Sequence, residues 1–147
     1  MMELDEIDKR LLRTLVRDAT QSAGALGRRL GLSQPATWRR IKRLEESGVI
    51  ARRVTLLDAG ALGLDLTVFV SLRASEHSEA WLDTLNTAIH DIPEVVEFYR
   101  MTGDVDYLLK LRVENMAAYD AVYRRIIRAV RLTDVSSAFS MEEIKCT

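Results

Sequence analysis

The amino-acid sequence predicts an α+β protein whose first part is helical and whose remainder alternates strands with helices. Three observations lead to this prediction. Apolar residues recur at helical spacing over residues 6–47, in segments that follow capping residues. A run of small residues over 58–63 then interrupts the pattern. Beyond it, the segments come in the order strand, helix, strand, strand, helix, strand.

The composition is that of an ordinary globular protein, with 147 residues of which 48% are apolar and 29% are charged. No apolar run approaches the roughly 18 residues that a membrane-spanning helix needs. The N-terminus also lacks the apolar core of a signal peptide, so we expect a cytoplasmic protein. A single cysteine, Cys146, excludes an internal disulfide and argues against thiol catalysis.

Charge is divided unevenly along the chain. Residues 1–57 hold twelve basic and seven acidic side chains, a balance of +5, whereas residues 58–147 hold nine and fifteen, a balance of −6. A basic part beside an acidic part is typical of a protein in which one part meets a polyanion such as nucleic acid. The charge count alone also allows a simple scatter of surface charges.

The first part predicts three helices, over about 6–18, 23–30 and 33–47. Residues that favour helix N-caps stand at their starts: Asp5, Ser22 and Ser33. The short turn between the second and third helices contains Gly31, which suits a helix end. Two helices joined in this way form a helix-turn-helix, whose second helix enters the major groove of DNA.

The third helix has an apolar face and a basic face. Thr37, Ile41 and Leu44 share one face, which we expect to pack on the first two helices. We predict that DNA is contacted from the cap and the opposite face, by Ser33, Gln34, Ala36, Arg39, Arg40 and Arg43. Arginine can bind guanine bidentately and glutamine can bind adenine, while basic groups also neutralise phosphates. The alternative is a solvated charged face paired with Glu45 and Glu46.

Two further features flank this helix. Trp38 borders the apolar face, so we interpret it as a structural residue. Residues 49–57 are predicted to form a strand, like that of a winged helix. Arg52 and Arg53 in this strand either touch DNA phosphate or only solubilise an exposed linker. We therefore expect a winged helix-turn-helix domain over residues 1–57.

The second domain, expected over residues 58–147, has the βαββαβ order of a ferredoxin-like fold. Its strands are predicted at 65–74, 95–101, 105–113 and 132–144, and its helices at 78–91 and 116–129. Both helices must cover one face of the sheet, and neither set of side chains in the first strand is polar enough to rest in water. We therefore expect the bare face to pair with a second copy. Such a dimer would suit two DNA half-sites about 34 Å apart.

Several stretches, taken in order, resemble the Lrp/AsnC (feast/famine) family of transcription regulators. In the first part they are residues 4–8 (LDEID), 30–33 (LGLS), 40–45 (RIKRLE) and 48–50 (GVI). In the second part, residues 102–107 (TGDVDY) resemble the turn motif of that family's ligand-binding domain. The resemblance covers nearly the whole chain. It implies a sequence-specific DNA-binding regulator that forms dimers, often gathered into octamers or other rings.

The resemblance also implies an amino-acid effector bound between dimers, near the turn and the last strand. The implied effector residues are Met101, Thr102, Gly103, Asp104, Asp106, Thr133, Asp134, Ser136 and Ser137. The Gly103 amide can bind a carboxylate, and Asp104 or Asp106 can receive an ammonium group. From the residues alone, Gly103 and Asp104 equally suit an ordinary hairpin turn.

An enzyme is the competing class. Asp104 and Asp106 have no evident base, nucleophile or metal partner. His77 and His90 have no Cys or His at ligand spacing, so no metal and no cofactor are expected. Sirohaem decarboxylases share the two-part layout, but the histidine- and arginine-rich signatures of their second domain are missing from residues 95–113. We therefore expect a regulator and not an enzyme.

Overall fold

The computed structural model describes residues 3–145, which divide into two compact units: residues 3–56 with Lys145, and residues 57–144. Each unit has its own buried apolar core. Among the described residues, no helix is both long enough and apolar enough to cross a membrane.

The first unit is a bundle of three helices: α1 (Glu6–Arg17), α2 (Ala23–Leu30) and α3 (Gln34–Glu46). The predicted caps are confirmed, because Asp5, Ser22 and Ser33 each accept a hydrogen bond from a backbone amide in the first turn of their helix. Apolar side chains from all three helices form the core: Leu11, Leu15, Leu26, Leu30, Ile41 and Leu44. The three helices therefore lie where the spacing of apolar residues predicts them.

The strand predicted over 49–57 does not form. Gly48 adopts a left-handed φ of 75° after α3, and the Ile50 amide donates to the Leu44 carbonyl at 3.0 Å. The next residues run without strand pairing and leave Val54 and Leu56 61% and 69% exposed. A strand needs a partner for its backbone hydrogen bonds, and no described segment supplies one here.

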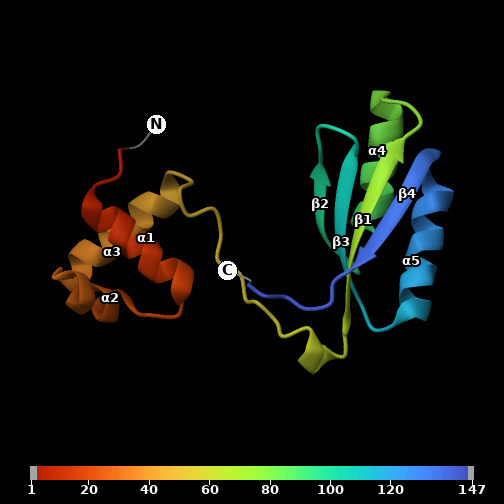
Figure 1. Cartoon of the computed structure of the whole chain (residues 1–147). Coiled ribbons are helices and arrows are strands. Elements are labelled where there is room, and N and C mark those ends of the chain that lie inside the picture. The colour runs from red at the N-terminus through yellow and green to blue at the C-terminus, as the bar shows by residue number, and fades with distance from the viewer. Residues whose placement is uncertain (1–2, 146–147) are drawn as a thin grey trace. The chain divides into compact units, whose positions relative to one another are not determined.

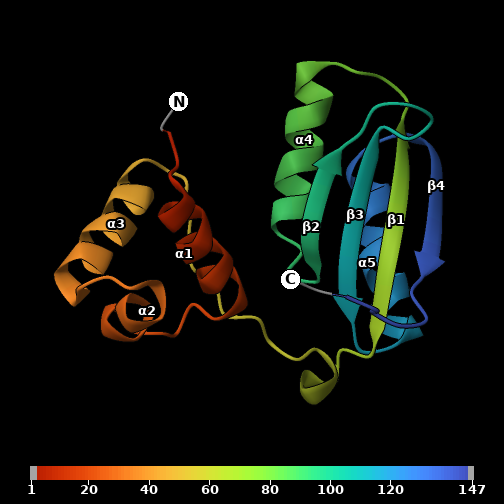
Figure 2. The ribbon, with the colours of Figure 1, turned by 60° about the vertical axis from the view of Figure 1, so that its left-hand side comes forward.

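The second unit has the predicted βαββαβ order. Its elements are β1 (Leu66–Ala74), α4 (Glu79–His90), β2 (Val95–Arg100), β3 (Tyr107–Val113), α5 (Met116–Ala129) and β4 (Leu132–Phe139). The strands form one antiparallel sheet in the order β2-β3-β1-β4. Both helices lie on the same face of this sheet (Figure 1, Figure 2). The ferredoxin-like prediction is confirmed.

Alternation along the strands divides their side chains between the two faces. In β1, Val68, Val70 and Leu72 are buried on the helix-covered face. They belong to one core with Leu85 of α4 and Ile126 of α5. Full burial of each such side chain contributes roughly 1.5–3 kcal/mol, so this core holds the helices on the sheet.

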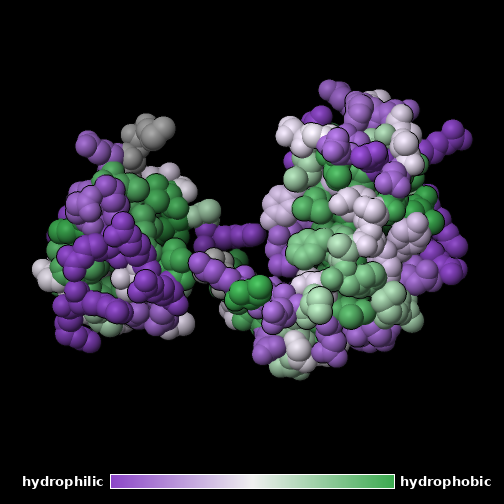
Figure 3. Space-filling model, in the orientation of Figure 1, coloured by the Kyte–Doolittle hydropathy of each residue, from purple (hydrophilic) through white to green (hydrophobic). Residues whose placement is uncertain are grey.

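The open face of the sheet is mixed in character. Phe69 and Tyr99 are 37% and 50% exposed, but β3 places Lys110 and Arg112 on the same face. Lys110 pairs with Glu97 at 3.1 Å. Figure 3 shows apolar and polar residues interspersed over this unit. Charged groups therefore share this face with apolar ones, and its pairing with a second copy stays a prediction.

The last strand is shorter than predicted. β4 ends at Phe139, where the Ser140 amide still donates to the Thr67 carbonyl at 2.9 Å. β1 begins at Leu66, only two residues beyond the Val68 that pairs with Phe139, so a β4 running to residue 144 would extend past its partner strand. The chain leaves the ladder instead, and Glu143 reaches the Arg112 guanidinium at 2.7 Å.

Candidate functional site

The turn between α2 and α3 brings the two helices very close together. Gly31 has a left-handed φ of 73°, and the Leu32 amide donates to the Gly27 carbonyl at 2.9 Å. A Cβ on Gly27 would lie 2.7 Å from the Leu32 carbonyl oxygen and 2.9 Å from the Thr37 hydroxyl. Glycine is therefore required inside α2, where it is otherwise an unfavourable residue. That unfavourable position is the signal by which sequence reasoning could have identified Gly27.

The outer side of α3 presents most of the residues predicted to contact DNA. Gln34 and Arg39 are exposed, and Ala36 is half-buried. The Ser33 hydroxyl accepts a hydrogen bond from the Ala36 amide at 3.3 Å, which leaves its proton able to donate elsewhere. The inner face is confirmed, because its three predicted residues are buried: Thr37, Ile41 and Leu44.

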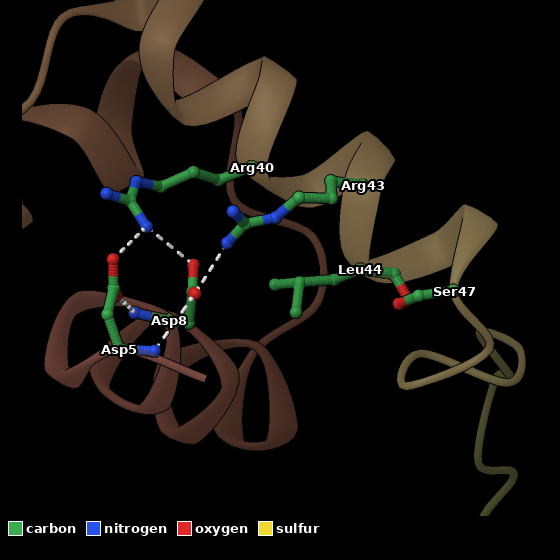
Figure 4. Close-up of polar contacts among 6 residues, drawn as sticks. All are labelled: Asp5, Asp8, Arg40, Arg43, Leu44 and Ser47. Carbon is green, nitrogen blue, oxygen red and sulfur yellow. Dashed lines mark hydrogen bonds and ion pairs between the residues drawn. The ribbon is translucent and has the colours of Figure 1, made fainter. Parts of the chain in front are cut away.

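Arg40 departs from the predicted arrangement. Its guanidinium Nη1 donates to Asp5 Oδ2 and to Asp8 Oδ1, each at 2.7 Å. Arg43 Nη2 donates to the other oxygen of Asp8 at 2.6 Å (Figure 4). The expectation that Arg40 faces outward is therefore corrected: its side chain turns toward α1, and Arg43 is shared between α1 and solvent.

The two carboxylates also cap α1. The Asp8 amide donates to Asp5 Oδ1 at 2.7 Å, and the Asp5 amide donates back to Asp8 Oδ2 at 3.3 Å, which forms a capping box. The hydrogen bond from the Asp8 backbone, followed by that from Arg40, holds the pKa of Asp5 below its ordinary 3.8. Asp5 first and then Asp8 raise the pKa of Arg40. The ionic cluster of Asp5, Asp8, Arg40 and Arg43 thus joins α1 to α3.

Three more side chains border α3. Arg52 is exposed, whereas Arg53 Nη2 donates to Glu45 at 2.9 Å. Trp38 is 54% exposed, with the Lys42 ammonium 5.2 Å from the centroid of its ring. This distance suits a cation–π contact. Trp38 is therefore a surface residue of α3, and not the packed structural residue that its sequence position predicts.

In the second unit, a tight turn joins β2 to β3. The Met101 amide donates to the Asp106 carbonyl at 2.8 Å and closes the turn. Gly103 has a φ of 107°, which favours glycine, and no other group lies within 4 Å of the place where its Cβ would be. Thr102 and Asp104 are exposed. The turn therefore leaves open space above the Gly103 backbone.

One oxygen of the Asp106 carboxylate makes a structural hydrogen bond. Its Oδ2 accepts a hydrogen bond from the Ala74 amide at 2.8 Å, at the end of β1. Its Oδ1 lies 3.9 Å from His77 Nε2. Arg73 donates to the Asp104 carbonyl at 2.6 Å. Among the described residues, Asp106 Oδ1 and the Asp104 carboxylate accept no hydrogen bond, so an ammonium group could bind to either.

β4 brings some of its implied effector residues to the same end of the sheet. Thr133 donates to the Ala74 carbonyl at 3.0 Å, and Asp134 pairs in register with Arg73. Ser136 lies one step further along the open face. Ser137 points to the other face, where its hydroxyl is hydrogen-bonded to that of Tyr119 in α5. Ser137 therefore does not share a surface with the turn.

Comparisons with known proteins match both units. A family described as "Winged helix-turn-helix DNA-binding" matches residues 4–51, and one described as "Lrp/AsnC ligand binding domain" matches residues 67–147. The glutamate uptake regulatory protein of Zymomonas mobilis is 50% identical, with 97% of this chain and 87% of the relative covered. This relative is named as a regulator, which favours the regulator interpretation over the decarboxylase alternative.

Solved structures agree with these matches. The crystal structure of an AsnC family transcriptional regulator from Agrobacterium tumefaciens has a TM-score of 0.92 and 50% identity, covering 98% of this chain and 94% of that one. The transcriptional regulator NMB0573 of Neisseria meningitidis, solved as a complex with L-Met, also has a TM-score of 0.92, at 26% identity, covering 99% and 94%. The fold prediction is confirmed over nearly the whole chain.

Proposed function

The chain belongs to the Lrp/AsnC family of transcription regulators, and we propose that it reads DNA with the outer side of α3 and binds an amino acid at the β2–β3 turn. The observation that carries the DNA proposal is the exposure of Gln34 and Arg39 on the second helix of a capped, tightly turned pair. Such a helix enters the major groove, where these two side chains can bond base edges. Ser33, Arg43, Arg52 and Arg53 would contact phosphates, and Ala36 would pack against the groove.

The proposed effector is a free amino acid. Its carboxylate would approach the open backbone at Gly103, and its ammonium would meet Asp104 or the remaining oxygen of Asp106. Met101, Thr102, Thr133 and Asp134 lie at the same end of the sheet, with Ser136 beyond them. The L-Met complex of the Neisseria relative supports this ligand class.

We further propose that the open face of the sheet pairs with a second copy of the chain. Phe69 and Tyr99 offer apolar contacts there, and Lys110 with Glu97 offers charged ones. A dimer would present two copies of α3 to two half-sites, and dimers would gather into an octamer or another closed ring. Action on chromosomal DNA would place the protein in the cytoplasm.

The DNA proposal is tested by selecting ligands for the full chain from a pool of random duplexes. The affinity of the selected duplex is then measured at several salt concentrations. We expect one enriched sequence and a logarithmic slope of about −0.9 for each phosphate contacted, because bound basic groups release counterions. No enrichment together with a flat salt response would reject DNA binding.

The effector proposal is tested by thermal unfolding in the presence of each of the twenty amino acids. A ligand that binds only the folded protein raises the melting temperature by mass action. Asp104→Asn keeps the size of the exposed side chain and should reduce the shift, whereas Asp120→Asn on α5 should retain it in full. An undiminished shift in Asp104→Asn and in Gly103→Trp would place the ligand elsewhere.

A further inference from the structure

The arginines of α3 are not equivalent. Arg39 is exposed, whereas Arg40 and Arg43 both donate to Asp8, a carboxylate that is only 1% exposed (Figure 4). The adjacent residues Arg39 and Arg40 carry the same charge and would contribute alike if α3 were a uniform basic surface. In the structure Arg39 is exposed to solvent, whereas Arg40 binds two carboxylates at the start of α1.

Arg40 is held by two carboxylates at once. A single nitrogen donates to both Asp5 and Asp8, and the Arg40 side chain is 25% exposed. If Arg40 turned toward DNA, the buried carboxylate of Asp8 would lose one of its two cationic partners. A buried charge left without its partner is strongly unfavourable. The guanidinium should therefore stay with α1 when DNA binds.

Arg43 is held less firmly. Its side chain is 49% exposed, and its contact with Asp8 involves one nitrogen. A half-exposed ion pair is screened by solvent, so a DNA phosphate can compete for this guanidinium. Asp8 would still retain Arg40 and the Asp5 amide. Arg43 can thus exchange its contact with Asp8 for a contact with a DNA phosphate.

We infer that Asp8, assisted by Asp5, is a positioning residue for DNA recognition: its carboxylate withholds Arg40 from the DNA, restrains Arg43 and leaves Arg39 as the reading arginine of α3. This inference rests on the proposed use of α3 for DNA contact. It gives the two acidic residues at the start of α1 a role in setting the strength of sequence-independent binding, because they limit how many arginines bind phosphate of any sequence. A phosphate contact strengthens binding to every sequence about equally, so withholding one weakens binding to random DNA without removing a base contact.

The test compares Arg39→Gln with Arg40→Gln in the full chain, on the DNA selected by the wild type. Loss of Arg39 should weaken binding about tenfold or more and relax discrimination at the base that it contacts. Loss of Arg40 removes the same charge one residue away, yet should leave the slope unchanged and the affinity within about threefold. A slope reduced by about 1 in Arg40→Gln would overturn the inference, because it would show that Arg40 reaches phosphate.

Asp8→Asn supplies the converse test. It should release arginines to the DNA, steepen the salt slope by about 1 and strengthen binding to random duplexes. Glu3→Gln makes the same change in net charge near the same end of the chain and should leave both quantities unchanged. An unaltered slope and an unaltered affinity for random duplexes in Asp8→Asn would also overturn the inference.

Stability is controlled with a milder variant. Asn caps helices as well as Asp does, so Asp5→Asn keeps the cap of α1 while removing one carboxylate from Arg40. It should shift the salt slope and the affinity for random duplexes in the direction of Asp8→Asn, by less. The absence of any effect in a folded chain counts against the inference. A flat salt response of the wild type would instead reject DNA binding itself.

Discussion

The two units of the chain are stabilised differently. Among the described residues, six buried apolar side chains form the core of the first unit and fourteen form that of the second. The first unit adds the buried Asp8, which ties α1 to α3 through Arg40 and Arg43. The charge pairs of the sheet unit, such as Lys110 with Glu97, lie outside its core. The stability of the small helical unit therefore depends on a few contacts, whereas the larger apolar core of the sheet unit can lose one contact and remain folded.

The largest expected effect separates the two cores. Leu44 and Leu109 are both fully buried, and Leu→Ala at either position removes about 2–5 kcal/mol of stability. A loss of this size takes most of the stability of a small unit. Leu44→Ala should therefore unfold the helical unit and abolish DNA binding, while Leu109→Ala leaves the sheet unit folded.

The measurement uses the two tryptophans of the chain. Trp81→Phe leaves Trp38 to report on the first unit, and Trp38→Phe leaves Trp81 to report on the second. Thermal unfolding is followed by fluorescence in each background. Equal losses of melting temperature for both leucine variants would contradict the difference between the cores.

An intermediate effect is expected from two glycines of α2. Gly27→Ala places a Cβ 2.7 Å from a backbone oxygen, and this overpacking should destabilise the unit by about 1–3 kcal/mol. Gly24→Ala meets only two flexible side chains, Gln34 at 3.4 Å and Arg28 at 3.9 Å, so it should stabilise α2 by up to about 1 kcal/mol. Chemical denaturation of the two variants decides the point, and the same sign for both would contradict the close approach of α2 and α3.

A smaller effect is expected from pH. The pKa of Asp5 is lowered in the folded state, so its stabilising contribution is present above 3.8 and is lost as the pH falls through the lowered value. Asp5→Asn retains the cap but cannot titrate. The melting temperature of the wild type should therefore fall more steeply than that of Asp5→Asn below pH 3.8. Parallel curves would show that the charge of Asp5 contributes nothing to folding.

Most of the fold follows from local signals. Helix caps, left-handed glycines and alternating apolar residues act within a few positions of the chain. Helices α1 to α5 and the order of the strands along the chain could therefore be predicted. Features that need a distant partner could not. The strand predicted at 49–57 has no neighbouring strand to pair with among the described residues. The hydrogen bond from the Ala74 amide to Asp106 depends on tertiary packing.

The exposed residues of the candidate DNA surface could be predicted, but the position of the Arg40 side chain could not. Gln34 and Arg39 are exposed as their helical positions indicate. Arg40 follows Thr37 by three residues and precedes Leu44 by four, which places it beside the buried face. That spacing was a usable signal of its half-burial. The two carboxylates that bind Arg40 lie 32 and 35 residues away in sequence, so only the fold reveals them.

The most direct test of DNA reading by α3 compares one exposed arginine from each unit. Arg39 on α3 and Arg128 on α5 are both exposed, and Ala at either position removes one positive charge. On the selected duplex, Arg39→Ala should lose about 1–3 kcal/mol of binding free energy while Arg128→Ala binds as the wild type does. Equal affinities of the two variants would contradict the assignment of α3 as the DNA-reading helix.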